Sequence, residues 1–204
     1  LFEPRVLVEQ PLPAADDGAL QAILGERKDL PAAAGWLDRI DNADDLAAVQ
    51  TRRAGILAAQ GRIDEARALL RKLPSATGEE QRMRLLAEVQ LLRDNKRYAE
   101  AYEVQAQLAT VAPEDNDVLY ELAMLAEKTG QPDRMETLLR QLIARDPRNH
   151  HAYNALGYSF ADRGIRLAEA RELILKALEL APGDPFITDS LGWVEFRLGN
   201  LPEA

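Results

Sequence analysis

The chain has 204 residues, a formal net charge of −9 and no cysteine. The acidic balance disfavours nucleic-acid binding, which needs a basic surface to neutralise phosphates. The lack of cysteine excludes disulfides, thiolate metal sites and thiol catalysis, and it leaves both cytosol and periplasm open as compartments.

The chain begins with a weakly patterned segment and then becomes helical. Residues 1–13 hold three prolines and predict an extended lead-in, in which the run RVLV could form a short strand or join the first helix pair. After it, good helix formers such as Ala, Leu, Glu and Arg dominate, and helix pairs are expected to the end of the chain. The expected pairs span about 14–46, 47–80, 82–115, 116–149 and 150–184, followed by a partial pair at 185–204.

Glycines mark the expected turns between the two helices of a pair. Gly61, Gly130, Gly164 and Gly199 each follow a helical pattern, where glycine commonly provides a left-handed cap. In the third pair Lys96 takes this place, so its turn should be slightly strained or of another type.

Three residue types repeat with one period in the second half of the chain. Prolines 113, 147 and 182, glycines 130, 164 and 199, and leucines 122, 156 and 191 are each spaced by 34 and then 35 residues. The extra residue lies in the turn between Gly164 and Ala170. A shared period near 34 predicts an all-α solenoid of antiparallel helix pairs.

Small residues are expected where the two helices of a pair approach closely. Gly157, Ala170, Ala177 and Gly192 occupy such positions, beside large residues that fill the neighbouring hollows.

The run from Tyr153 to Tyr158, followed by Gly164, Ala170 and Pro182, resembles the tetratricopeptide repeat. Residues 190–204 begin another copy. The resemblance covers nearly the whole chain after residue 13, and it implies a right-handed superhelix whose groove, lined by the first helix of each pair, binds peptides or protein segments.

Residues 154–204 also look like the C-terminal part of large proteobacterial proteins of this family, several of which are outer-membrane lipoproteins facing the periplasm. One such lipoprotein brings cell-wall hydrolases to a carboxyl-terminal processing protease. If the full-length chain is such a lipoprotein, this likeness implies the periplasmic face of the outer membrane; the alternative is the cytoplasm. No signal peptide, lipobox cysteine or membrane-spanning run is present, so any export signal or lipid anchor would have to lie upstream of Leu1. Because the sequence stops at Ala204, where a helix should begin, we expect a fragment of a longer protein.

The resemblance also implies a set of partner-binding residues, namely those on the groove face of the first helices that are not packing positions. Tyr158 and Trp193 could instead pack between neighbouring repeats. The set lacks the paired Lys and Asn positions that clamp the carboxylate of an acidic C-terminal tail. The expected groove residues are Arg93, Tyr120, Met124, Glu127, Lys128, His151, Asn154, Tyr158, Asp162, Asp189, Trp193 and Arg197.

No motif predicts catalysis, a cofactor or a metal. The adjacent His150 and His151 point about 100° apart in a helix and cannot chelate one ion. Paired carboxylates such as Glu79 and Glu80 stand where helices begin, and there a negative charge suits the helix dipole. Phosphate-loop, dinucleotide and hydrolase signatures are absent.

We therefore expect a non-enzymatic scaffold or adaptor that binds a protein, with a protease and its substrates as one set of partners. The alternative is a structural module that mediates oligomerisation.

Overall fold

A computed structural model describes residues 46–200, all of whose regular elements are helices. The expectations for the lead-in at 1–13, nearly all of the first repeat at 14–46, and residues 201–204 lie outside this range. The chain divides into two compact units, residues 1–76 and 77–204, which are described separately.

The described part of the first unit is one helix pair. Helix α3 (Leu46–Ala59) packs against α4 (Ile63–Leu70). Gly61 adopts φ +80° at the turn, and the Arg62 amide donates to the carbonyl of Leu57 across it at 2.9 Å. The predicted left-handed cap at Gly61 is therefore confirmed.

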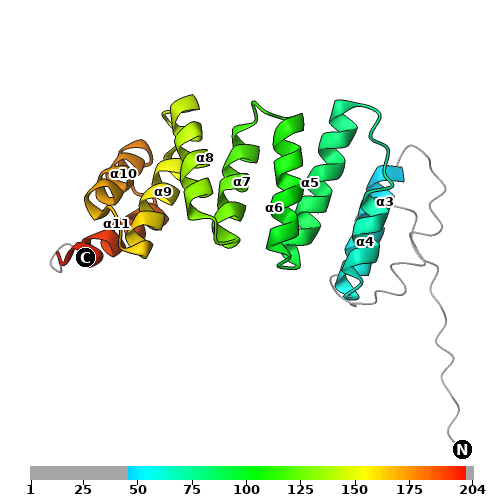
Figure 1. The fold of residues 1–204 in the computed structure, drawn as a ribbon, viewed down its shortest axis with the longest axis horizontal. Helices are drawn as coiled ribbons and strands as arrows, with labels where there is room; N and C mark the ends of the chain where they lie inside the picture. Colours follow the sequence, from blue (N-terminus) through cyan, green and yellow to red (C-terminus); the bar gives the residue numbers. More distant parts are fainter. Residues whose placement is uncertain (1–45, 201–204) are drawn as a thin grey trace, which may run out of the picture. The chain divides into compact units, whose positions relative to one another are not determined.

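The second unit is a row of helices in which each packs on the next (Figure 1). The last helix contacts both of the two helices before it, so first helices of successive pairs also meet. The helices are α5 (Gly78–Asp94), α6 (Tyr98–Val111), α7 (Asn116–Lys128), α8 (Pro132–Arg145), α9 (His150–Arg163), α10 (Leu167–Leu180) and α11 (Pro185–Leu198).

Side-chain caps fix where the first helices begin. Asp115, Asn149 and Asp184 each accept backbone N–H groups at the starts of α7, α9 and α11. Thr77 and Glu80 form a reciprocal capping box, which starts α5 ahead of the expected beginning of the third repeat at residue 82. The carboxylate pair at Glu79 and Glu80 is thus a helix start, as predicted.

The turns inside the pairs share one backbone geometry. Gly130, Gly164 and Gly199 have φ between +68° and +85°, and Lys96 takes the same place with φ +59°. At Lys96 the Arg97 amide donates to the Leu92 carbonyl at 2.8 Å, as happens at the glycine turns. The turn at Lys96 is therefore of the same type, with the strain of a side chain in a left-handed conformation.

The extra residue of the fifth pair has a structural role. Between Gly164 and α10 the chain includes Arg166, which has φ +49° and precedes the first residue of α10. Its guanidinium pairs with Glu136 on α8 at 2.8 Å and with Glu169 on α10 at 2.5 Å. It also lies 4.4 Å from the centre of the Phe160 ring, so the insertion links three helices.

The core of the second unit follows the predicted packing. One buried cluster joins α7 to α11, and a second joins α5, α6 and the outer side of α7. Gly157, Ala170 and Ala177 are buried at the contact between α9 and α10. A Cβ atom added to Gly157 would lie 2.8 Å from the Ala170 carbonyl oxygen and 2.7 Å from Ile174, which confirms the close approach predicted there.

Polar contacts tie successive pairs together. Arg82 on α5 pairs with the capping carboxylate of Asp115 at 2.8 Å, and Arg145 on α8 donates to the carbonyl of Pro113 at 2.7 Å. The Arg82 guanidinium, and after it the helix-start amides, lower the pKa of Asp115. These contacts fix the helix ends at which one pair meets the next.

Candidate functional site

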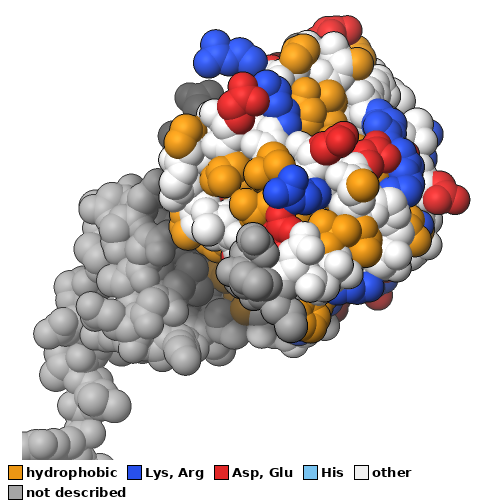
Figure 2. All heavy atoms as spheres, turned by 90° about the vertical axis from the view of Figure 1, so that its left-hand side faces the viewer, with side chains coloured by type: hydrophobic (Ala, Val, Ile, Leu, Met, Phe, Trp, Pro, Cys, Tyr) orange, Lys and Arg blue, Asp and Glu red, His pale blue; other side chains and the backbone are white. Residues whose placement is uncertain are grey.

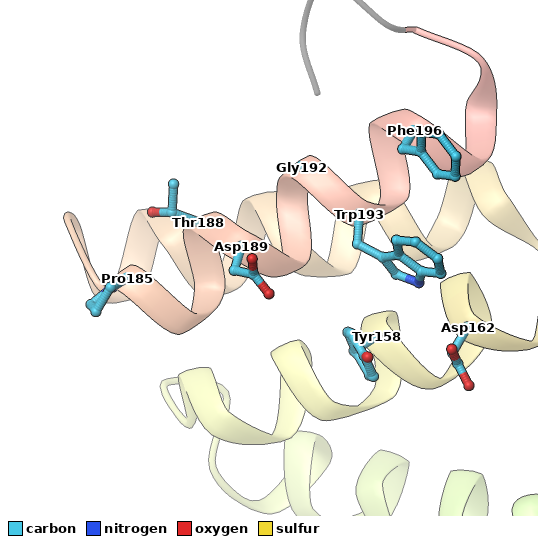
Figure 3. A pocket seen from close by; sticks show the side chains of 8 residues that line it. All are labelled: Tyr158, Asp162, Pro185, Thr188, Asp189, Gly192, Trp193 and Phe196. Carbon is cyan, nitrogen blue, oxygen red and sulfur yellow. The ribbon is translucent and has the colours of Figure 1, made fainter.

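A cleft lies between α9 and α11, the first helices of the last two described pairs. It has a volume of about 970 Å³. In Figure 3, Trp193 and Asp189 extend from α11 toward α9, on which Tyr158 lies. We call it the α9–α11 cleft, and its lining residues are Tyr158, Asp162, Pro185, Thr188, Asp189, Gly192, Trp193 and Phe196.

The cleft combines exposed aromatic rings with carboxylates. Tyr158 is 40% exposed and Phe196 is 53% exposed, although large apolar side chains are usually covered. The rings of Trp193 and Phe196 are stacked, with centroids 5.5 Å apart. Asp162 and Asp189 are exposed, and neither carboxylate forms an ion pair within residues 46–200. Figure 2 shows the corresponding end of the molecule, where apolar side chains are interspersed with charged ones.

Arg197 contacts two residues of the cleft lining, Asp162 and Trp193. Its Nη1 donates to the backbone carbonyl of Asp162 at 2.7 Å, and its guanidinium carbon lies 5.4 Å from the centre of the Trp193 ring. The guanidinium also covers Gly164, where an added Cβ would collide with it. Arg197 therefore holds the C-terminal ends of α9 and α11 together and fixes the position of Trp193.

The structure brings five of the expected groove residues to this cleft or its edge: Tyr158, Asp162, Asp189, Trp193 and Arg197. Trp193 is also partly buried against the core, so it has both of the roles that were weighed for it. Tyr158 is outside the core cluster and its neighbours.

A second group of expected residues lies along α7 and the start of α9. The ring of Tyr120 lies 6.1 Å from that of His151, and both Tyr120 and Met124 pack partly against the core. Glu127 is half-buried, and its pKa is raised first by this burial and then by the negative charge of Asp162, while Lys128 opposes the shift. Burial, followed by the charges of Glu121 and Glu127, likewise raises the pKa of Tyr120.

Of the two remaining expected residues, Arg93 forms an ion pair within the protein and Asn154 has a buried side-chain oxygen. Arg93 on α5 pairs with Glu121 on α7 at 2.8 Å and so ties two repeats together. Asn154 has a buried Oδ1 atom that finds no hydrogen-bond partner within residues 46–200.

Sequence reasoning missed Phe196 as a lining residue, and it also missed the most exposed apolar side chain of α11, Phe186, at 79%. A comparison of repeats could have found both. One period earlier, Phe196 corresponds to the buried Ala161 and Phe186 to the exposed His151. The sequence signal is a phenylalanine at a position where the preceding repeat has a different, smaller or polar residue.

Neither a metal-binding cluster nor a helix able to span a membrane is found in the described part of the chain. Across residues 46–200, no set of three His, Asp or Glu side chains is arranged to hold a metal. The same stretch contains no helix with the length and apolarity that a membrane crossing needs. His150 and His151 begin α9 after the Asn149 cap, with ring centroids 4.0 Å apart.

Comparison with known proteins agrees with the repeat geometry. Residues 120–185 match the family model described as tetratricopeptide repeat. A TPR repeat-containing protein of Pseudomonas aeruginosa, PA4667, is 40% identical over 179 residues. The comparisons support a tetratricopeptide repeat protein. The aligned region covers 88% of this chain but 30% of that relative, so the chain spans about a third of the relative's length.

Solved structures show the same fold at low sequence identity. MamA from Desulfovibrio magneticus RS-1 superposes with a TM-score of 0.60 and 20% identity, covering 78% of this chain and 88% of MamA. YrrB, described as a TPR protein with an unusual peptide-binding site, gives 0.55 and 17%, covering 86% of each chain. At this identity the likeness establishes the solenoid of helical repeats.

Proposed function

We propose that this chain is a non-enzymatic protein-binding module that holds an extended segment of a partner against α7, α9 and α11. The observation that carries the proposal is the α9–α11 cleft, where exposed aromatic rings and carboxylates converge between two first helices. Aromatic side chains are enriched among the residues that dominate protein-binding energy. YrrB, a protein of the same fold, is described as having a peptide-binding site, which supports this use of the fold.

The proposal is tested with peptides selected from a displayed random library against the purified chain. Affinity is then measured by fluorescence anisotropy for the double variant Tyr158→Ala/Phe196→Ala. We expect binding to weaken about tenfold or more, since truncating two central aromatic contacts removes interface area.

The matched control is Leu175→Ala, which truncates an apolar side chain that is 36% exposed on α10, outside the cleft. It should leave affinity unchanged, and circular dichroism should show equal helicity for all variants. Unchanged affinity in the double variant, or a failure to select any peptide, would overturn the proposal.

A finer version makes the chain part of a periplasmic lipoprotein that delivers substrates to a carboxyl-terminal processing protease. It rests on the resemblance of residues 154–204 alone, and no feature of residues 46–200 favours a protease over another partner. Reconstitution with a purified protease and a cell-wall hydrolase tests it. This version requires that the full-length chain accelerates cleavage of the hydrolase, and a rate independent of the chain would exclude it.

A further inference from the structure

The two carboxylates of the α9–α11 cleft have no cationic partner among residues 46–200, unlike several acidic side chains on neighbouring helices. Nearby, Glu136 and Glu169 are both bound by arginines, and the buried Glu195 accepts from Arg171 at 2.5 Å and from Asn200 at 2.7 Å. Asp162 and Asp189, in contrast, face the cleft, form no ion pair within residues 46–200, and are the only charged residues that line it.

The cations beside the cleft do not neutralise its lining. Arg197 is held by the backbone carbonyl of Asp162 and by the Trp193 ring, and it is not a lining residue. Lys128 is exposed on α7, next to the half-buried Glu127. The carboxylate of Glu127 interacts both with Lys128 and with Asp162. The cleft therefore presents negative charge to a ligand, on a chain whose formal net charge is −9.

The aromatic residues suit the rest of a cationic side chain. The methylenes of lysine or arginine can lie on apolar rings while the charged end reaches a carboxylate. The protein already makes such a contact internally, because Arg197 lies over Trp193. Tyr158 and Phe196 offer exposed rings of the same kind within the cleft.

We propose that the α9–α11 cleft binds an extended peptide segment in which a lysine or arginine stands beside an aromatic or large aliphatic residue. The cation pairs with Asp162 or Asp189, and the apolar neighbour lies against Tyr158, Trp193 and Phe196. The inference rests on the proposed binding function and specifies the chemistry of the partner at the same site.

The test uses three fluorescein-labelled octapeptides that differ only at the two positions flanking a central phenylalanine. These positions are both lysine, both glutamine or both glutamate. We expect the lysine peptide to bind at least about tenfold more tightly than the glutamate peptide at low salt, and its advantage to shrink as salt screens the charges. The isosteric double variant Asp162→Asn/Asp189→Asn should reduce that advantage to less than about threefold.

The control variant makes the same change in net charge elsewhere. Glu103→Gln/Glu172→Gln alters two exposed carboxylates on the second helices α6 and α10, and it should keep the lysine preference. The inference would be overturned if the Asp162→Asn/Asp189→Asn variant kept the lysine preference, or if the control variant lost it. Either result would mean that the preference does not come from the cleft carboxylates.

The remaining outcomes separate this inference from the proposed function. Equal binding of all three peptides, weakened by Tyr158→Ala/Phe196→Ala, would leave a peptide-binding cleft without charge selectivity. If neither double variant changes the affinity, the peptide does not bind in the cleft, and the proposed function fails as well. Concentration-dependent dimerisation in light scattering, abolished by Phe196→Ala, would show that the occupant is a second copy and would overturn the peptide proposal.

Discussion

Gly157 lies where the backbone of the neighbouring helix α10 leaves no room for a side chain. An added methyl group would meet the backbone carbonyl of Ala170, which cannot move without shifting α10. We expect Gly157→Ala to lower the free energy of unfolding by about 1–3 kcal/mol through overpacking. Urea unfolding followed by circular dichroism measures the change.

Gly55 provides the matched control, since it lies inside α3 and no atom of residues 46–200 lies within 4 Å of its would-be Cβ. Gly55→Ala should raise the free energy of unfolding by about 0.5–1 kcal/mol, because alanine favours the helix. An unchanged or raised stability in Gly157→Ala would contradict the packing argument.

Lys96 carries a strain that glycine would relieve. It is exposed, has φ +59°, and occupies the turn position that Gly61, Gly130, Gly164 and Gly199 hold elsewhere. Lys96→Gly should therefore stabilise the chain by about 1 kcal/mol, measured as a higher urea midpoint at constant slope. Lys96→Ala separates strain from charge, because it removes the ammonium but keeps the Cβ. Equal stability of the two variants would mean that the backbone strain has no measurable cost.

At the scale of elements, Glu195 joins α10 to the end of α11. Its side chain is 3% exposed, and the hydrogen bond from Asn200, then that from Arg171, lowers its pKa. A carboxyl whose folded pKa lies below its unfolded value, about 4.3, stabilises the fold fully above that value. This contribution is lost as the pH falls through the folded pKa.

We therefore expect Glu195→Gln to be clearly less stable than the wild type at neutral pH. The difference in unfolding free energy between the two proteins should shrink steadily as the pH is lowered from about 5 to about 3. Urea titrations at several pH values measure it, with Glu172→Gln on the exposed side of α10 as the control whose difference stays small throughout. A pH-independent difference for Glu195→Gln would refute the role assigned to its charge.

At the scale of the whole molecule, the sequence period was sufficient to predict the solenoid because each repeat packs only on its neighbours. The glycine turns and the contact at Gly157 followed from the same period, since they are local to one helix pair. Lys96 was identified as unusual, but its backbone angle was not predictable, because the cost of a left-handed lysine is small beside the packing of α5 on α6.

The candidate site was less predictable because it depends on contacts between repeats. Residues such as Tyr158 and Asp189 were expected on the groove face. The comparison of repeats singles out Phe196 as unusual, but its place in the lining depends on how α9 and α11 lie side by side. Likewise, the insertion near Arg166 was located in the sequence, but its bonds to Glu136 depend on where α8 passes the turn.

The contact between Arg197 and Gly164 has a consequence for reading natural variants of this chain. Gly164 is outside the cleft lining, yet any side chain there would push the guanidinium from the carbonyl of Asp162 and release Trp193. A missense change at Gly164 would thus weaken ligand binding even though Gly164 itself does not line the cleft. In a mutational scan for ligand binding, substitutions of Gly164 would therefore reduce binding as substitutions of the cleft residues do.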